Sequence, residues 1–256
     1  MKILHLGYSD TKGGAAIAMM RLHNSLIKEN IDSKVLVAEK LSSDPNVIGP
    51  SKSLEVILND VKNVLVRQKK FLIKEKNNFS NSLNIFRSNI IKKINSIKPD
   101  IINLHWINNK LISISQIKEI TQPIVWTFLD MWPMCGGEHY VSDERFVHGY
   151  DTTLKRPDES GIDLNKFLWK LKKRYFNKKI NHVICISNWL KKKAEKSYLF
   201  KKNKISYVPC TLNNKDWRPK DKIEARRLLK LPEKKMIYLF VSTNGEKDYR
   251  KGYQFL

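Results

Sequence analysis

The segment Asp130–Tyr140 gathers the residue types in this chain that are best suited to chemistry. It follows an apolar run at 123–129 and combines Asp130, Glu138 and His139 with Trp132 and two adjacent glycines. Carboxylates and imidazoles can orient hydroxyl groups and move protons, and aromatic faces can stack on sugar rings. We therefore predict a functional site here. The alternative is a loop that is only structurally ordered.

A second candidate is the segment Lys12-Gly13-Gly14-Ala15, between an expected first strand at 2–8 and a helix that follows it. Glycines let a backbone approach a ligand closely, and a helix N-terminus favours anions. The pair does not form the GxGxxG pattern of dinucleotide-binding loops. An ordinary turn between strand and helix is the alternative interpretation.

Two further motifs stand at the ends of expected strands. His105 and Trp106 end the strand at 101–106, and ligands of open α/β sheets gather at the carboxyl ends of strands. A structural histidine is the competing interpretation. Arg250 and Lys251, which precede Gly252, form a cation pair suited to a diphosphate, or a surface charge in a lysine-rich chain.

The elements that must position these residues alternate between strand and helix. Such alternation is typical of an α/β fold with a parallel, doubly wound sheet. The expected helix at 15–30 has apolar residues at helical spacing (Ile17, Met20, Leu22, Leu26 and Ile27) and a plausible stop at Asn30. Further strands are expected at 34–39, 101–106, 123–129, 182–187 and 204–210, and helices at 82–97, 113–120, 164–179 and from Asn188.

Two of the expected helices are basic, those at 54–76 and 164–179. A basic amphipathic helix can lie on an anionic membrane. The alternative is a helix that packs on the core and exposes its lysines to water. The stretch 130–161 should form a long, ordered loop, which in a compact fold is usually functional.

The chain is expected to divide into three parts. Residues 1–210 form a Rossmann-like domain, 211–221 a linker, and 222–256 the start of a second domain with a helix at 222–230 and a strand at 236–242. One strand and the start of a helix cannot bury a core. We therefore expect the sequence to stop just inside that second domain.

Composition limits the function classes. The 256 residues are 41% hydrophobic and carry 48 basic against 25 acidic side chains, a formal charge of +23. This excludes a disordered chain. The charge suggests an anionic partner, but it equally fits the lysine bias of an AT-rich genome, and no nucleic-acid-binding motif is present. Three cysteines without a CxxC pair argue against a disulfide framework or zinc site.

Taken together, the motifs resemble glycosyltransferase family 4, whose members have two Rossmann-like domains in the GT-B fold. The likeness is strongest to enzymes of bacterial lipopolysaccharide, O-antigen and capsule synthesis. It rests on the order and spacing of GGAAIAMMRLHNSL, DIINLHWIN, PIVWTFLDMWPMCGGEHY, RPDESGIDLN, ISNWL and RKGYQFL.

The resemblance implies transfer of a sugar from a nucleotide-sugar donor to a glycan or lipid-linked acceptor, with retention at the anomeric carbon and without a metal or cofactor. Gly13 and Gly14 would approach the donor phosphates, and Arg250 and Lys251 would neutralise the departing diphosphate. A cytoplasmic location follows, either free or peripheral on the inner face of the plasma membrane. Nucleic acid is not an expected partner.

Two departures from the family pattern affect this hypothesis. Many relatives carry a histidine before the aspartate of the Asp-Met-Trp motif, where this chain has Leu129. Asp130 and His139 are the candidates for the catalytic role, with His105, Trp106, Trp132 and Glu138 contacting substrate. The glutamate-rich donor motif of the family is not reached. The alternative function is a catalytically inactive module that binds a membrane surface or a glycan.

Overall fold

The computed structural model describes residues 1–50, 81–109, 111–151, 163–176, 178–242, 245 and 248–256. The chain divides into two units, Met1–Leu212 and Asn213–Leu256, each of which is described by itself. The basic helix predicted at 54–76 and most of the RPDESGIDLN motif lie outside the described residues.

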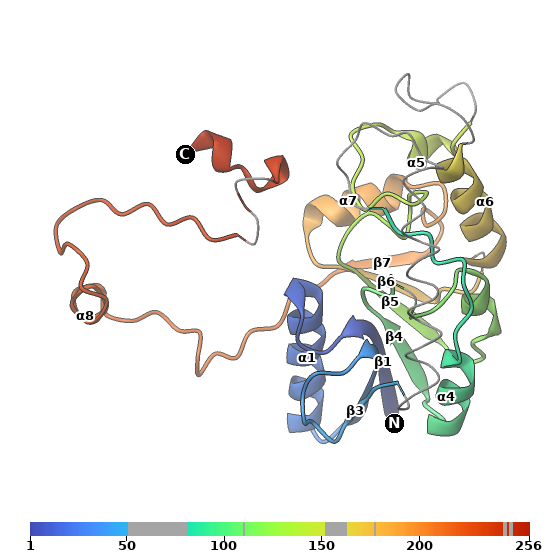
Figure 1. Cartoon of the computed structure of the whole chain (residues 1–256), viewed down its shortest axis with the longest axis horizontal. Helices are drawn as coiled ribbons and strands as arrows, with labels where there is room; N and C mark the ends of the chain where they lie inside the picture. Colours follow the sequence, from blue (N-terminus) through green and yellow to red (C-terminus); the bar gives the residue numbers. More distant parts are fainter. Residues whose placement is uncertain (51–80, 110, 152–162, 177, 243–244, 246–247) are drawn as a thin grey trace. The chain divides into compact units, whose positions relative to one another are not determined.

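The first unit is built on one parallel sheet, which contains seven strands among the described residues (Figure 1). Its order is β3-β2-β1-β4-β5-β6-β7, and every pairing is parallel. This reversal of strand order next to β1 is the Rossmann arrangement. The strands are β1 (Lys2–Ser9), β2 (Asp32–Glu39), β3 (Val47–Ile48), β4 (Ile101–Leu104), β5 (Ile124–Phe128), β6 (His182–Cys185) and β7 (Lys204–Tyr207).

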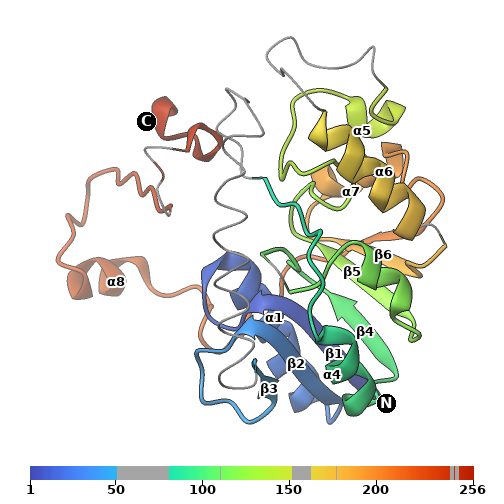
Figure 2. The same ribbon diagram turned by 45° about the vertical axis from the view of Figure 1, so that its right-hand side comes forward.

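Helices lie on both sides of the sheet. α1 (Gly13–Lys28) and α7 (Asn188–Lys196) lie on one side, and α4 (Ile90–Ile97) and α6 (Leu164–Phe176) on the other (Figure 1). Figure 2 shows β1, β2 and β4 running side by side, with β3 at the edge of the sheet. The predicted α/β class with a Rossmann-like amino-terminal domain is confirmed.

The helix ends follow local chemistry. The Ser187 hydroxyl accepts a hydrogen bond from the Leu190 amide at 3.2 Å and so caps α7, which explains the start of the helix predicted from Asn188. Asn30 adopts a left-handed conformation with φ 58° just beyond α1, so the predicted stop is confirmed. Lys98 ends α4 in the same way, before Pro99.

The buried face of α1 differs from the predicted one. Ala16, Met19 and His23 are the buried residues of this helix, whereas Ile17 and Ile27 are 45% and 37% exposed. The apolar spacing therefore misplaced the face that packs on β1 and β2. A small residue at 16 and a polar one at 23 carry no hydrophobic signal, so the pattern of large apolar residues could not reveal this packing.

Three other element predictions need correction. Residues 82–89 are not helical, and only Ile90–Ile97 forms α4. The expected helix at 113–120 is a short 3₁₀ helix, η1 (Ser115–Glu119). The loop that begins at Asp130 contains a short helix, α5 (Arg145–His148). Asn84 accounts for part of the first difference, because it adopts a left-handed conformation with φ 46° and its side-chain amide donates to the Ile107 and Ile112 carbonyls.

The main core packs the sheet against α4, α6 and α7. It includes Leu4, Ile102, Trp126, Phe128 and Phe200, each at most 1% exposed. The Trp126, Phe128 and Phe200 rings meet edge to face with centroids 4.9 to 6.3 Å apart. This core extends beneath the segment after β5 and gives it a rigid base.

The second unit contains α8 (Lys222–Leu228) and two 3₁₀ turns, η3 (Tyr249–Lys251) and η4 (Tyr253–Phe255). The strand predicted at 236–242 is wrong, because these residues are extended without a pairing strand in the described part of the unit. Tyr238 and Leu239 are more than 80% exposed. An apolar run forms a strand only where a neighbouring strand receives its hydrogen bonds. Among the described residues, no helix has the length and apolar character needed to cross a membrane.

Candidate active site

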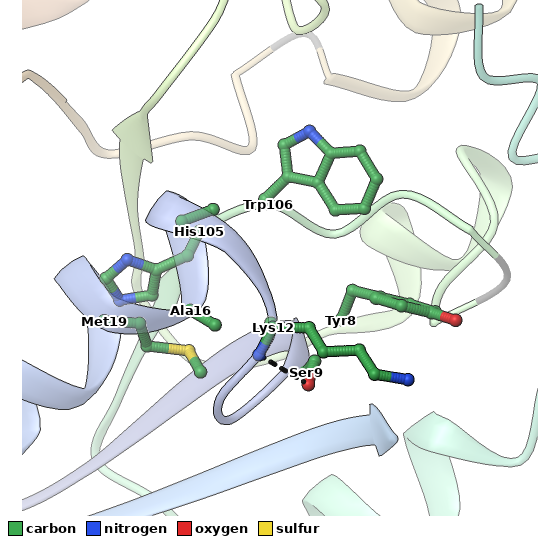
Figure 3. A pocket seen from close by; sticks show the side chains of 9 residues that line it. Tyr8, Ser9, Lys12, Ala16, Met19, His105 and Trp106 are labelled. Carbon is green, nitrogen blue, oxygen red and sulfur yellow. Dashed lines mark hydrogen bonds between the residues drawn. The ribbon is translucent and has the colours of Figure 1, made fainter. Parts of the chain in front are cut away.

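A pocket of about 40 Å³ opens at the carboxyl end of β1, beside the first turns of α1. Its lining includes Tyr8, Ser9, Lys12, Ala16 and Trp106. Figure 3 shows the Tyr8 and Trp106 rings toward one side of the pocket, and His105 with Met19 toward the other. The rings of Tyr8 and Trp106 meet edge to face at 5.9 Å. The pocket therefore offers an aromatic wall beside a lysine.

Ser9 holds the backbone of the loop that leads into α1. The Ser9 hydroxyl accepts from the Thr11 and Lys12 amides at 3.4 and 3.3 Å, the second of which is drawn in Figure 3. Gly13 has φ +83°, a conformation that favours glycine. A Cβ atom on Gly13 or Gly14 would meet nothing within 4 Å, so open space lies beside both. No side chain caps this helix, and its first turn holds no acidic residue. Such an N-terminus attracts negative charge.

Lys12 adds a charged group at the same end of β1. Its Nζ lies 2.5 Å from Glu39 Oε1, at the end of the neighbouring strand β2. This hydrogen bond raises the pKa of Lys12 above its ordinary value, so the ammonium stays charged. Because the lysine side chain is 61% exposed, it can leave Glu39 for a more strongly charged ligand.

The two residues predicted as catalytic candidates, Asp130 and His139, contact each other next to Trp106. His139 Nδ1 lies 2.5 Å from Asp130 Oδ2, which also accepts from the Trp106 indole nitrogen at 2.9 Å. The other Asp130 oxygen accepts from the Trp132 amide, and His139 Nε2 lies 2.9 Å from the Ser82 hydroxyl. The Asp130 and His139 side chains are 9% and 5% exposed. They lie behind Trp106, and a direct catalytic role for them stays a prediction.

Two residues predicted to contact substrate are interior side chains. Trp132 is 1% exposed and donates its indole N–H to the Ser82 carbonyl. Glu138 is also 1% exposed; it accepts from Arg145 at 3.0 Å and from the Tyr150 hydroxyl at 3.0 Å. Both are enclosed and support the segment in this structure, and their contact with a substrate stays a prediction.

A buried cation holds the same segment from the α6 side. Lys172 is 0% exposed, and its Nζ donates to the carbonyls of Trp132, Cys135 and Gly136, the last two at 2.9 and 2.6 Å. Nζ also lies 3.6 Å from the centroid of the Trp132 ring. Burial lowers the pKa of Lys172 to about 7. The three carbonyl acceptors match the three N–H donors of an ammonium group, so this geometry favours the charged form.

The two glycines of the segment are explained by close packing against α6. A Cβ on Gly136 would stand 2.5 Å from the Asn165 carbonyl oxygen, which is backbone and cannot move aside. The Gly137 amide donates to the Asn165 side chain at 3.0 Å. The glycine pair predicted as part of a site is therefore a packing requirement.

Three histidines lie together beneath the β1 pocket. His5 Nδ1 is 3.0 Å from His105 Nε2, and the His5 and His23 ring centroids are 6.0 Å apart. Burial lowers the pKa of His105 to about 3, and burial followed by the charge of His105 lowers that of His5 further below its ordinary value. Both rings are neutral at pH 7. His105 lines the pocket with a buried ring, whereas Trp106 presents the more accessible surface.

Arg250 and Lys251 lie in the second unit. The Arg250 guanidinium pairs with Asp248 through Nε and Nη2, at 3.0 and 2.6 Å. Within the described residues, no group of three or more His, Cys, Asp or Glu side chains is arranged to hold a metal ion. The diphosphate-binding role of this cation pair and the metal-free chemistry both stay predictions.

Comparison with known proteins now gives the family. The sequence profile of Glycosyltransferase Family 4 matches residues 12–215, from the glycine loop to the end of the first unit. The chain belongs to glycosyltransferase family 4. Among curated proteins, no sequence match was found.

Solved structures of low sequence identity resemble this family member. They include HepE of Anabaena in complex with UDP (11% identity, TM-score 0.45) and a glycosyltransferase of Rickettsia africae (12%, TM-score 0.43). Each comparison covers 90% of this chain and 50% of the other. The chain thus spans about half the length of these structures.

Sequence reasoning missed the residues that connect the two parts of the site. Tyr8 and Ser9 lie within the first strand and carry no motif of their own. Ser82 contacts His139 in the segment after β5 from 57 positions away in the sequence. Lys172 binds carbonyls of the same segment from 36 to 40 positions away. The one available signal was Lys172 within a basic helix, but nothing in its spacing distinguishes a buried lysine from its exposed neighbours.

Proposed function

We propose that this chain carries the acceptor-side domain of a retaining glycosyltransferase, which moves a sugar from a nucleotide-sugar donor to a glycan or lipid-linked acceptor. The observation that supports this most directly is the position of Trp106. Its ring lines the pocket beside Lys12, and its indole nitrogen donates to Asp130. One residue thus joins an anion-favouring loop to a buried carboxylate–imidazole pair.

Each part of the pocket has a role in this proposal. The amides at the start of α1 and the Lys12 ammonium attract the diphosphate of the donor. Tyr8 and Trp106 offer flat surfaces to a sugar ring. Asp130 and His139 hold Trp106 in place from behind, so we assign them as positioning residues.

The chemical step would break the bond between the anomeric carbon and the diphosphate oxygen. An acceptor hydroxyl then forms the new glycosidic bond on the same face, and its proton leaves with the departing diphosphate. Negative charge grows on that diphosphate as the bond breaks, so fixed positive groups lower the barrier. We propose that Arg250 and Lys251 supply such charge.

The biological setting is part of the same proposal. Synthesis of a bacterial surface polysaccharide, such as lipopolysaccharide, provides lipid-linked acceptors at the cytoplasmic face of a membrane. The basic helix α6 is suited to an anionic membrane surface, since its exposed residues include Lys170, Lys173 and Arg174.

The test is a transfer assay of the chain with a panel of radiolabelled nucleotide-sugars and bacterial lipid and glycan acceptors. We expect label in a product whose anomeric configuration, read by NMR, matches that of the donor. Trp106→Ala and Lys251→Ala should each lower the rate by about tenfold or more. Lys92→Ala, at an exposed position on α4, is the matched control and should not. Product of inverted configuration would contradict the retaining mechanism, and no transfer from any donor would contradict the proposed activity of this chain.

A further inference from the structure

A second hollow of about 310 Å³ lies along α6, and it shares no lining residue with the β1 pocket. Lys166, Lys170 and Lys173 line it, together with Trp169, Tyr198 and Asp151. We call it the α6 groove. The three lysines stand at positions i, i+4 and i+7 of one helix, so their side chains share a face over a length of about 10 Å.

These lysines are available to a ligand. In the part of the chain that the structure describes, none of the three forms an ion pair with an acidic side chain. Asp151 is the one acidic residue among those lining the groove. The groove lining therefore has an excess of positive charge, with three lysines against one carboxylate.

The pKa of Tyr198 reflects that positive charge. Lys173 Nζ lies 4.7 Å and Lys201 Nζ 5.4 Å from the centroid of its ring. A hydrogen bond with Lys173, followed by the charges of Lys173, Lys201 and Lys202, lowers the pKa of Tyr198 below its ordinary value. The same ammonium groups that favour a phenolate would favour any other anion in its place.

The floor of the groove is rigid. The Trp169 ring is 3% exposed and lies between Tyr150, stacked at 5.9 Å, and Tyr198, edge-on at 5.2 Å. Gly149, at φ +99°, passes so close that a Cβ there would be 3.2 Å from the Trp169 ring. The indole nitrogen of Trp169 is buried, with no hydrogen-bond acceptor among the described residues. A binding surface that is held in advance loses less entropy on binding.

We propose that the α6 groove is a second ligand site, which binds the phosphate groups of an anionic ligand through Lys166, Lys170 and Lys173. Lysine is a compact point charge that suits phosphate, and three of them spread along a helix face match a diphosphate better than a single carboxylate. This site is separate from the β1 pocket, because none of its residues lines that pocket.

The first experiment titrates the chain with inorganic pyrophosphate at constant ionic strength, followed by calorimetry. We expect saturable binding that weakens about tenfold or more when Lys166, Lys170 and Lys173 are all changed to Gln. The matched control changes Lys28, Lys92 and Lys118 to Gln. These are exposed lysines on α1, α4 and η1 that no described ion pair includes, and their replacement lowers the net charge equally.

A second readout reports on the groove alone. Pyrophosphate should raise the pKa of Tyr198 toward its ordinary value, because a bound anion offsets the nearby ammonium charges. The difference in phenolate absorbance between the unmodified chain and Tyr198→Phe isolates this tyrosine from the others. Circular dichroism checks that the variants are folded.

The source of the phosphate is decided with vesicles of phosphatidylcholine, with and without phosphatidic acid. One outcome is that the protein sediments with the vesicles only when they contain phosphatidic acid, only with the three groove lysines present, and not when pyrophosphate is added. That result would identify a lipid headgroup. Binding of pyrophosphate without vesicle binding would identify a soluble phosphorylated ligand. Equal weakening in the control triple variant, or no saturable binding of either probe, would overturn the proposal.

Discussion

The β1 pocket and the segment Asp130–His139 stand side by side but are built in opposite ways. The pocket is lined by Tyr8, Lys12 and Trp106 among others, and its lysine is exposed. Open space also lies beside Gly13 and Gly14 at the start of α1. The segment is enclosed, and its polar groups are bonded to Ser82, Arg145 and Lys172. Trp106 belongs to both regions, since its side chain lines the pocket and its indole N–H donates a hydrogen bond to Asp130 of the segment.

The contrast suggests different roles for exposed and buried groups. Groups that must meet a ligand remain exposed, and their intramolecular partners can be exchanged. Groups that fix geometry are buried, where a broken hydrogen bond is costly. Changes in the enclosed segment should therefore act first on stability, and changes in the pocket first on binding.

The largest effect should come from Lys172→Met, which keeps the length of the side chain but removes its charge. Three carbonyl oxygens would lose their donor in a buried position. We expect the free energy of unfolding to fall by about 3 kcal/mol, measured by urea denaturation. Lys92→Met, on the exposed side of α4, is the control and should change it by less than about 0.5 kcal/mol. Equal stability of both variants would show that the buried ammonium does not hold the segment.

The base of the open pocket should respond to acid. The folded-state pKa of His105 is about 3, below an unfolded value of about 6.5, so the unfolded chain binds more protons between these values. The stability contributed by the neutral ring is complete above about pH 6.5 and decreases as the pH falls toward 3. At about pH 5 we expect a loss of about 2 kcal/mol from this residue.

Denaturation at several pH values checks that expectation. His105→Asn should flatten the acid slope, whereas His148→Asn, at a side chain that is 57% exposed, should leave it unchanged. An identical slope in all three proteins would mean that His105 is not the group that takes up the proton.

The smallest effects should separate the two glycines at the start of α1. Gly13→Ala forces a side chain into φ +83° and should cost about 1 kcal/mol of stability. Gly14→Ala has free space and a helical position, so its stability should be unchanged or slightly higher. Thermal denaturation measures both changes. If Gly14→Ala nevertheless weakens nucleotide-sugar binding, the added methyl group stands where the ligand approaches; unchanged binding would remove Gly14 from the site.

Much of the fold was predictable because it depends on local pattern. The alternation of apolar strands and helices indicated the parallel sheet, and Ser187 and Asn30 stand at helix ends for local reasons. The strand predicted at 236–242 was wrong, since a strand also needs a neighbouring strand, and none pairs with this segment among the described residues. The buried face of α1 was wrong because Ala16 and His23 carry no apolar signal.

The sequence by itself determined the family, the strand–loop–helix entry at Gly13 and Gly14, and the clustering of polar residues after β5. These are short-range properties of residue type and order. Tertiary structure alone decided which of the side chains line a pocket and which are buried. Trp132, Glu138 and Lys172 became interior supports, while Tyr8, Lys12 and Trp106 line the pocket. The physical reason is that burial and hydrogen-bond partnership depend on chain segments tens of residues apart, which meet only when the sheet has formed.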